Sequence, residues 1–195
     1  MPGLFDKVVA AKPAAGGQYP KMGKYWFIID EAKKGTHQTK TTEFMVFEGK
    51  VLYVLDPMEV DVPDSEKHEN GRGRGPKAGE PMSMNFMDGV EGNEGRLKSF
   101  IMGAVACAEA DVTKPMLELA VSVQQPMKDI VVEVFAGPLV TKKKKNIVAS
   151  RVVRRIPASE VAKTMNASEK AAQLGNGRLE RMLAFETAEL AASVK

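Results

Sequence analysis

A dense group of lysines and arginines in the last third of the sequence carries the clearest chemical signal. Between Thr141 and Arg155 the chain has no acidic residue, and its cations are Lys142, Lys143, Lys144, Lys145, Arg151, Arg154 and Arg155. Clustered cations neutralise the phosphates of a nucleic acid and release its counterions, which makes binding salt-sensitive. Loop lysines follow a variable backbone, whereas strand arginines fork onto phosphates or stack on bases. The pattern indicates nucleic-acid contact, and the alternative is a solvated loop that prevents edge pairing.

Aromatic side chains are the second component of single-strand recognition, because exposed rings stack on unpaired bases. Tyr25, Trp26 and Phe27 are consecutive on an expected strand, so Trp26 faces opposite to the other two. Phe44 and Phe47 are three apart, which places them on opposite faces of a regular strand. We expect Tyr25, Trp26 or Phe47 to stack on bases, and the pattern leaves open which of them is exposed.

A glycine-rich segment, Gly71-Arg-Gly-Arg-Gly75, is similar to the RGG-type segments that bind single strands through flexible cationic contacts. Arg72 and Arg74 are therefore further candidates for nucleic-acid binding. An acidic stretch precedes them, and this suggests an alternative role as a self-masking loop that competes with phosphate. Residues 56–80 show no periodicity and are predicted to form a flexible insertion.

The residue patterns of enzymes and metal sites do not appear in the sequence. Its two histidines, His37 and His68, have polar surroundings, and no Cys/His spacing, phosphate-binding loop or nucleophile elbow is present. Asp61 and Asp64 are typical of solvated loop carboxylates. Cys107 is the single cysteine and lies in an apolar run, so it is expected to be a buried small hydrophobe. We expect no catalytic residue, no metal and no cofactor.

The composition is that of an ordinary globular protein with one core. The chain has 195 residues, a formal net charge of +3, 44% hydrophobic and 27% charged residues. No signal-peptide pattern begins it, and no apolar run reaches the roughly 18 residues of a membrane span. These features predict a cytoplasmic protein of bacterial or phage type, without membrane contact.

Periodicity predicts the elements that hold these residues. Strands are expected over 24–31, 41–48 and 81–87, with 51–55 continuing the second strand or forming another and 33–40 forming a hairpin loop. An amphipathic helix is predicted over 95–109, and a short helical segment from Lys114 to Val123. Two further strands cover 129–136, broken by Gly137-Pro138, and 146–156, ended by Pro157.

The order of these elements predicts the fold class. Three strands, a helix and two more strands is the order of the OB-fold, a five-stranded antiparallel barrel within the α+β class. We expect an N-terminal arm over 1–22, the OB-fold-like domain over 23–157 and a helical tail over 158–195, split in two at Gly175 and Gly177. The intervening residues 56–80 are its flexible insertion.

Four segments carry a family resemblance: 23–29, 42–48, 95–104, and the lysine-rich turn that leads into 146–153. On these segments the chain resembles the OB-fold single-stranded DNA-binding proteins encoded by tailed phages. The resemblance implies a non-enzymatic protein that coats single-stranded DNA during phage DNA replication or recombination, without sequence preference, in the host cytoplasm.

The C-terminal tail departs from this family. Many such proteins recruit replication partners through an acidic tail, whereas this chain ends in a nearly neutral segment. We therefore expect the tail helices to pack on the domain or to form a homo-oligomer, and other replication proteins are secondary candidate partners. The alternative function is a structural or protein-interaction component of a phage particle on an OB-like scaffold. A nuclease would need convergent carboxylates, which the sequence offers only in the acidic loop.

Overall fold

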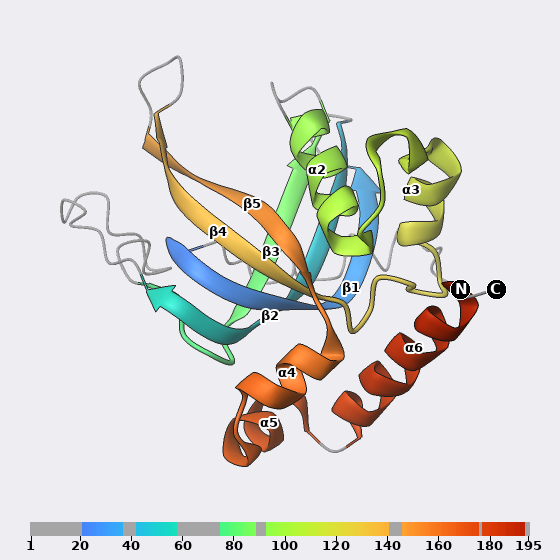
Figure 1. Cartoon of the computed structure of the whole chain (residues 1–195). Helices are drawn as coiled ribbons and strands as arrows, with labels where there is room; N and C mark the ends of the chain where they lie inside the picture. Colours follow the sequence, from blue (N-terminus) through green and yellow to red (C-terminus); the bar gives the residue numbers. More distant parts are fainter. Residues whose placement is uncertain are drawn as a thin grey trace, which may run out of the picture.

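A five-stranded antiparallel sheet forms the centre of the molecule. The computed structural model describes residues 21–36, 42–57, 75–88, 93–140, 146–175 and 177–193. The strands are β1 (Gly23–Thr36), β2 (Glu43–Pro57), β3 (Pro81–Met87), β4 (Val131–Val140) and β5 (Asn146–Ile156), in the order β3-β2-β1-β4-β5 (Figure 1). The α+β class and the antiparallel five-stranded sheet are confirmed. Within the described residues β3 and β5 are edge strands that do not pair, so the sheet is not closed into a barrel.

Helices follow the third and the fifth strand. Between β3 and β4 lie α2 (Asn93–Val105), a 3₁₀ turn (Glu109–Asp111) and α3 (Lys114–Ala120). After β5 come α4 (Ala158–Thr164), α5 (Ala167–Leu174) and α6 (Arg178–Ser193), which lie at the other side of the sheet from α2 and α3 (Figure 1). The predicted break of the tail at Gly175 and Gly177 is confirmed, because it separates α5 from α6. The part before this break forms two helices, because Asn166 caps α5 by accepting a hydrogen bond from the Glu169 amide at 2.9 Å.

The sheet has a hydrophobic core on both faces, and β1 contributes to both. Tyr25, Phe27 and Ile29 lie in the core beneath α2 and α3. Trp26 and Ile28 point the opposite way, into the core beneath α4, α5 and α6. Where both faces of a strand are covered, consecutive side chains are apolar, which explains the unbroken run of large side chains at 25–29.

The predicted ends of the first and fourth strands are wrong, because both strands continue to pair with a neighbouring strand beyond them. Lys33 was expected in a loop, but it pairs with Val46 and extends β1, and its Nζ lies 2.8 Å from a carboxylate oxygen of Glu48. Gly137-Pro138 was expected to break the fourth strand, yet β4 continues there in register with β5. Because β1 pairs with β4 only as far as Ala136, the missing N–H of the proline can face a side with no neighbouring strand.

The second strand runs through Gly49 without a turn. A Cβ at this position would lie 2.0 Å from the Ile28 carbonyl oxygen, so only glycine allows β1 and β2 to approach this closely. The end of the predicted insertion is also tied to β2, because the Gly79 amide donates to the Val51 carbonyl at 2.8 Å. The rest of that insertion over 58–74 lies outside the described residues, as do residues 1–20 of the predicted arm over 1–22. The last residue of that arm, Met22, is buried.

Helix α2 is shorter than predicted. It ends at Val105, since Ala106 adopts a left-handed φ of 56°, a conformation typical of the residue that follows a helix. None of the helices in the described part of the chain combines the length and the apolar character required to cross a membrane.

Candidate nucleic-acid interface

The three arginines predicted on β5 have different surroundings. Arg154 donates two hydrogen bonds to the Glu160 carboxylate, at 2.7 and 2.6 Å. Arg155 donates to Glu189 of α6 at 2.8 Å. Both charges are therefore neutralised within the protein, and a phosphate would have to compete with a carboxylate for either side chain. Their contact with nucleic acid remains a prediction.

Arg151 differs from these two because it is exposed and faces an aromatic ring. Its guanidinium carbon lies 5.5 Å from the centre of the Phe135 ring on β4. The two residues are cross-strand partners in the β4–β5 register. No carboxylate of the described residues forms an ion pair with Arg151, so its charge remains available to an anion.

A row of three side chains crosses this part of the sheet. Phe135 pairs with Lys24 of β1 on one side and with Arg151 of β5 on the other. The Phe135 side chain is 36% exposed, whereas its neighbour Val134 is fully buried in the opposite core. A β-bulge next to the row leaves Val153 of β5 exposed as well. We call Lys24, Phe135 and Arg151 the cross-strand row.

Glu133 fixes the cations at one side of this row. Its side chain is buried, with 4% of the residue exposed, and one carboxylate oxygen lies 2.9 Å from the Lys24 Nζ. The other oxygen lies 3.3 Å from Arg154 Nη2. A buried carboxylate is stable only when it is paired, and here two cations from the flanking strands satisfy it. Glu133 of β4 therefore holds the Lys24 side chain in place on the surface.

The aromatic residues predicted to stack on bases are buried instead. Tyr25 and Phe47 are 0% exposed and Trp26 is 2% exposed, so none of them presents a ring face to a base. Trp26 packs on Tyr53 with ring centres 5.3 Å apart, and Phe47 on Phe100 at 4.3 Å. The prediction for these three residues is wrong. Alternation along one strand assigns a face to each ring, but it does not reveal that both faces of this sheet are covered.

The remaining predicted residues lie outside the described part of the chain. These are Lys142, Lys143, Lys144, Lys145, Arg72 and Arg74. The four lysines come between Val140, where β4 ends, and Asn146, where β5 begins. Their role stays a prediction.

Sequence reasoning missed Phe135. The signal was present, because Val132, Val134 and Ala136 form one apolar alternation, and Glu133 and Phe135 fall between them on the other face. The alternation assigns Phe135 to this face but does not reveal its exposure, because Glu133 on the same face is buried.

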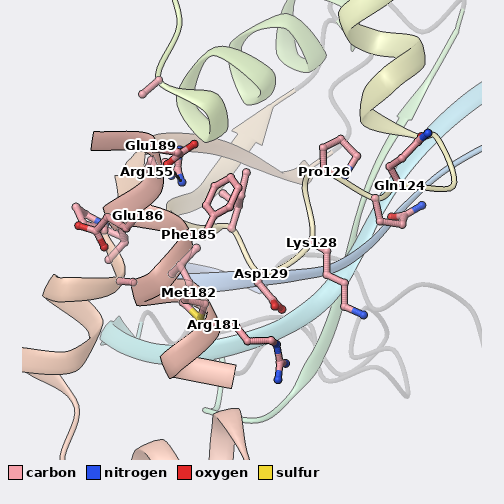
Figure 2. A pocket seen from close by; sticks show the side chains of 17 residues that line it. Gln124, Pro126, Lys128, Asp129, Arg155, Arg181, Met182, Phe185, Glu186 and Glu189 are labelled. Carbon is pink, nitrogen blue, oxygen red and sulfur yellow. Dashed lines mark hydrogen bonds and ion pairs between the residues drawn. The ribbon is translucent and has the colours of Figure 1, made fainter. Parts of the chain in front are cut away.

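A cavity of about 670 Å³ lies between α6 and the segment that precedes β4 (Figure 2). Phe185 of α6 projects into this space and is 53% exposed. Carboxylates line its wall: Glu189 is paired with Arg155, and Glu186 accepts a hydrogen bond from the Ser159 hydroxyl at 2.9 Å. Because carboxylates repel phosphate, this cavity suits a polyanion less well than the cross-strand row does.

Among the described residues, no cluster of three or more histidine, cysteine, aspartate or glutamate side chains is arranged to hold a metal ion. Comparison with protein-family models found no family that matches this sequence, and comparison with curated proteins found no match. The function is therefore inferred from the geometry of the chain itself.

Proposed function

We propose that this protein binds single-stranded DNA without catalysing a reaction, at the β4–β5 side of the sheet. The observation that carries the proposal is the cross-strand row, in which an exposed aromatic ring lies between two cations in register. A base stacks on the Phe135 ring, while Arg151 contacts a neighbouring phosphate. A phosphate on the other side of the ring competes with Glu133 for Lys24. Such contacts are independent of sequence, because every base has an aromatic face.

The topology supports the same proposal. The order β3-β2-β1-β4-β5 with a helix between β3 and β4 is that of an OB-fold opened between β3 and β5. In OB-folds the loop between the fourth and fifth strands is one of those that bind oligonucleotides. In this chain that connection contains Lys142 to Lys145. We therefore propose the OB-fold as the finer fold class and phage DNA replication or recombination as the context.

Replacement of Phe135 tests the proposal. Base stacking contributes about 1–3 kcal/mol, so Phe135→Ala should weaken binding of a labelled oligo-dT by roughly 5-fold to 150-fold, measured by fluorescence anisotropy at two salt concentrations. Phe185→Ala is the matched control, since Phe185 is an exposed ring on α6 outside the row. Equal affinity of the Phe135→Ala protein and the wild type would contradict the proposal. RNA and duplex DNA, titrated alongside, define the preference.

A protein-interaction role is the second candidate, and the exposed Phe185 in the cavity of Figure 2 favours it. A structural component would form large ordered assemblies without nucleic acid and would not bind oligonucleotides. Sedimentation of the purified protein, alone and with oligo-dT, separates the two functions.

A further inference from the structure

One side of α6 is left exposed by the packing of the C-terminal helices. Its exposed positions recur at spacings of three and four, which places them on the same side of the helix: Arg181, Ala184, Phe185, Ala188 and Glu189. We call these five residues the α6 stripe. The buried side of the same helix carries Met182, which packs in the core that contains Trp26. The α6 stripe is therefore a surface that the fold of a single chain does not cover.

Phe185 is the apolar centre of the α6 stripe. It is 53% exposed and lies at the cavity of Figure 2, with Pro126 on the facing segment. Ala184 and Ala188 flank it on the helix, and their small side chains allow a second helix to approach closely. An exposed aromatic ring is the group on this surface that gains most from being buried against another molecule.

The two ends of the α6 stripe carry opposite charges. Arg181 lies one turn before Phe185, and Glu189 lies one turn after it (Figure 2). In the described part of the chain Arg181 forms no ion pair. Glu189 binds Arg155, but its side chain is 43% exposed and can accept a second cation. The stripe thus has a cationic end, an apolar centre and an anionic end.

This order of charges makes the α6 stripe complementary to itself. When two copies of α6 run antiparallel about a two-fold axis at Phe185, residue 181 of each copy lies opposite residue 189 of the other. Both arginines then face a glutamate, and each Phe185 ring packs against the small alanines of the second copy. A parallel pair would place Arg181 beside Arg181 and Glu189 beside Glu189. The charges therefore favour the antiparallel pair alone.

We propose that the α6 stripe is a dimer interface, and that it binds the α6 stripe of a second copy of this chain in antiparallel orientation. The pair is closed by its two-fold axis, so association stops at two copies. One stripe on one helix is a small interface, so the dimer is weak and reversible, with a Kd on the order of 10 μM. Its formation does not depend on the proposed binding of DNA.

Sedimentation velocity of the full-length protein without nucleic acid tests the dimer. Between about 1 and 300 μM the wild type should pass from monomer to dimer and form nothing larger. Phe185→Ala should raise the dimer Kd by roughly 30-fold or more, because each dimer loses two buried rings. Thr187→Ala is the matched control, since Thr187 is exposed on the same helix outside the α6 stripe and its truncation should leave the Kd unchanged.

Exchange of charges tests the orientation. Arg181→Glu alone creates two glutamate–glutamate contacts in the dimer, and Glu189→Lys alone creates two contacts between cations, so each protein should stay monomeric. An equimolar mixture of the two should form a heterodimer, because both contacts then join opposite charges. Glu180→Lys, on the other side of α6, should dimerise as the wild type does.

The Arg181→Glu protein decides the proposal by itself if Glu189→Lys does not fold without its contact to Arg155. Dimerisation of Arg181→Glu with wild-type affinity overturns the proposal. A wild type that stays monomeric over the whole range also overturns it and leaves the α6 stripe to a different protein, and assemblies larger than two copies overturn the closed pair.

Failure of the dimer and failure of the proposed function give different results. Phe135→Ala should dimerise as the wild type does, because Phe135 lies on β4 outside the α6 stripe. Oligo-dT titrations at protein concentrations below the dimer Kd compare monomers, so Phe185→Ala remains a control for base stacking in those titrations.

Discussion

At the scale of single residues, ion pairs between β5 and the C-terminal helices set the charge of this side of the molecule. The bidentate contact between Arg154 and Glu160 joins β5 to the first turn of α4. Arg155 and Glu189 join the same strand to α6. These carboxylates reduce the positive charge of β5 and leave Arg151 as the arginine of that strand that faces an aromatic ring.

The Arg154–Glu160 pair predicts a specific dependence of stability on pH. Hydrogen bonding by Arg154 lowers the pKa of Glu160 from its ordinary value of 4.5. A carboxylate whose pKa is lower in the folded state stabilises the protein above about pH 4.5, and this contribution is lost as the pH falls through the folded-state pKa. The Glu160→Gln protein should therefore lose less stability than the wild type between about pH 5 and pH 3, measured from urea unfolding.

Glu109→Gln is the matched control for this measurement. Lys98 also lowers the pKa of Glu109, but that carboxylate is exposed to solvent and screened. Its replacement should change the pH profile less than Glu160→Gln does. A larger effect of Glu109→Gln on the pH profile would contradict the prediction that the Arg154–Glu160 pair contributes more to the pH dependence of stability.

At the scale of elements, α2 packs closely on β5 through a glycine. A Cβ at Gly103 would lie 2.4 Å from Val152 Cγ1 and 3.1 Å from its Cβ. A Cβ at Gly95, in the same helix, would meet no atom within 4 Å. At Gly103 the helix lies so close to β5 that only glycine fits. At Gly95 there is room for a larger side chain.

These two glycines predict opposite effects of the same substitution. Alanine is favoured over glycine inside a helix by about 0.5–1 kcal/mol, so Gly95→Ala should stabilise the protein by up to this amount. Gly103→Ala should destabilise it by about 1–3 kcal/mol, because the stiff Val152 side chain has to move. Urea unfolding of both proteins measures the difference. Stabilisation by both substitutions would mean that α2 is not held against β5 at Gly103.

The elements were largely predictable from the sequence because their signals are local. Apolar alternation predicts the third strand over 81–87 and the fifth over 146–156 with the bounds that the structure shows. The continuation of β4 through Pro138 depends on where β1 stops, which is far away in the sequence. The site was predictable in part for the same reason: Arg151 follows from a charged strand, whereas the burial of Trp26 depends on helices that come long after it.

At the scale of the whole molecule, the C-terminal helices complete the second core. Val161 of α4 and Met165 are buried against Trp26 and Ile28, and Met182 of α6 joins the same core. The expectation that the tail packs on the domain is thus confirmed for these helices. Self-association through the tail stays a prediction.

The second core predicts how the single tryptophan responds to a change in α4. Val161→Asp places an unpaired charge in this core, so it should lower the free energy of unfolding by several kcal/mol and shift Trp26 emission to longer wavelength. Lys163→Asp, on the exposed side of the same helix, should cost about 1 kcal/mol or less and leave the emission unchanged. Identical spectra for the two proteins would contradict the role assigned to α4.

The position of β1 between β2 and β4 has a consequence for the order in which the chain folds. β1, β2 and β3 follow one another in the sequence and can pair as soon as they leave the ribosome, whereas Gly23 must wait for Ala136 before its other side is paired. Until then β1, with its run of large apolar side chains at 25–29, exposes unpaired backbone groups along one edge. While residues 93–130 are being synthesised, this edge of β1 stays unpaired, and β1 strands of two nascent chains can pair with each other and aggregate.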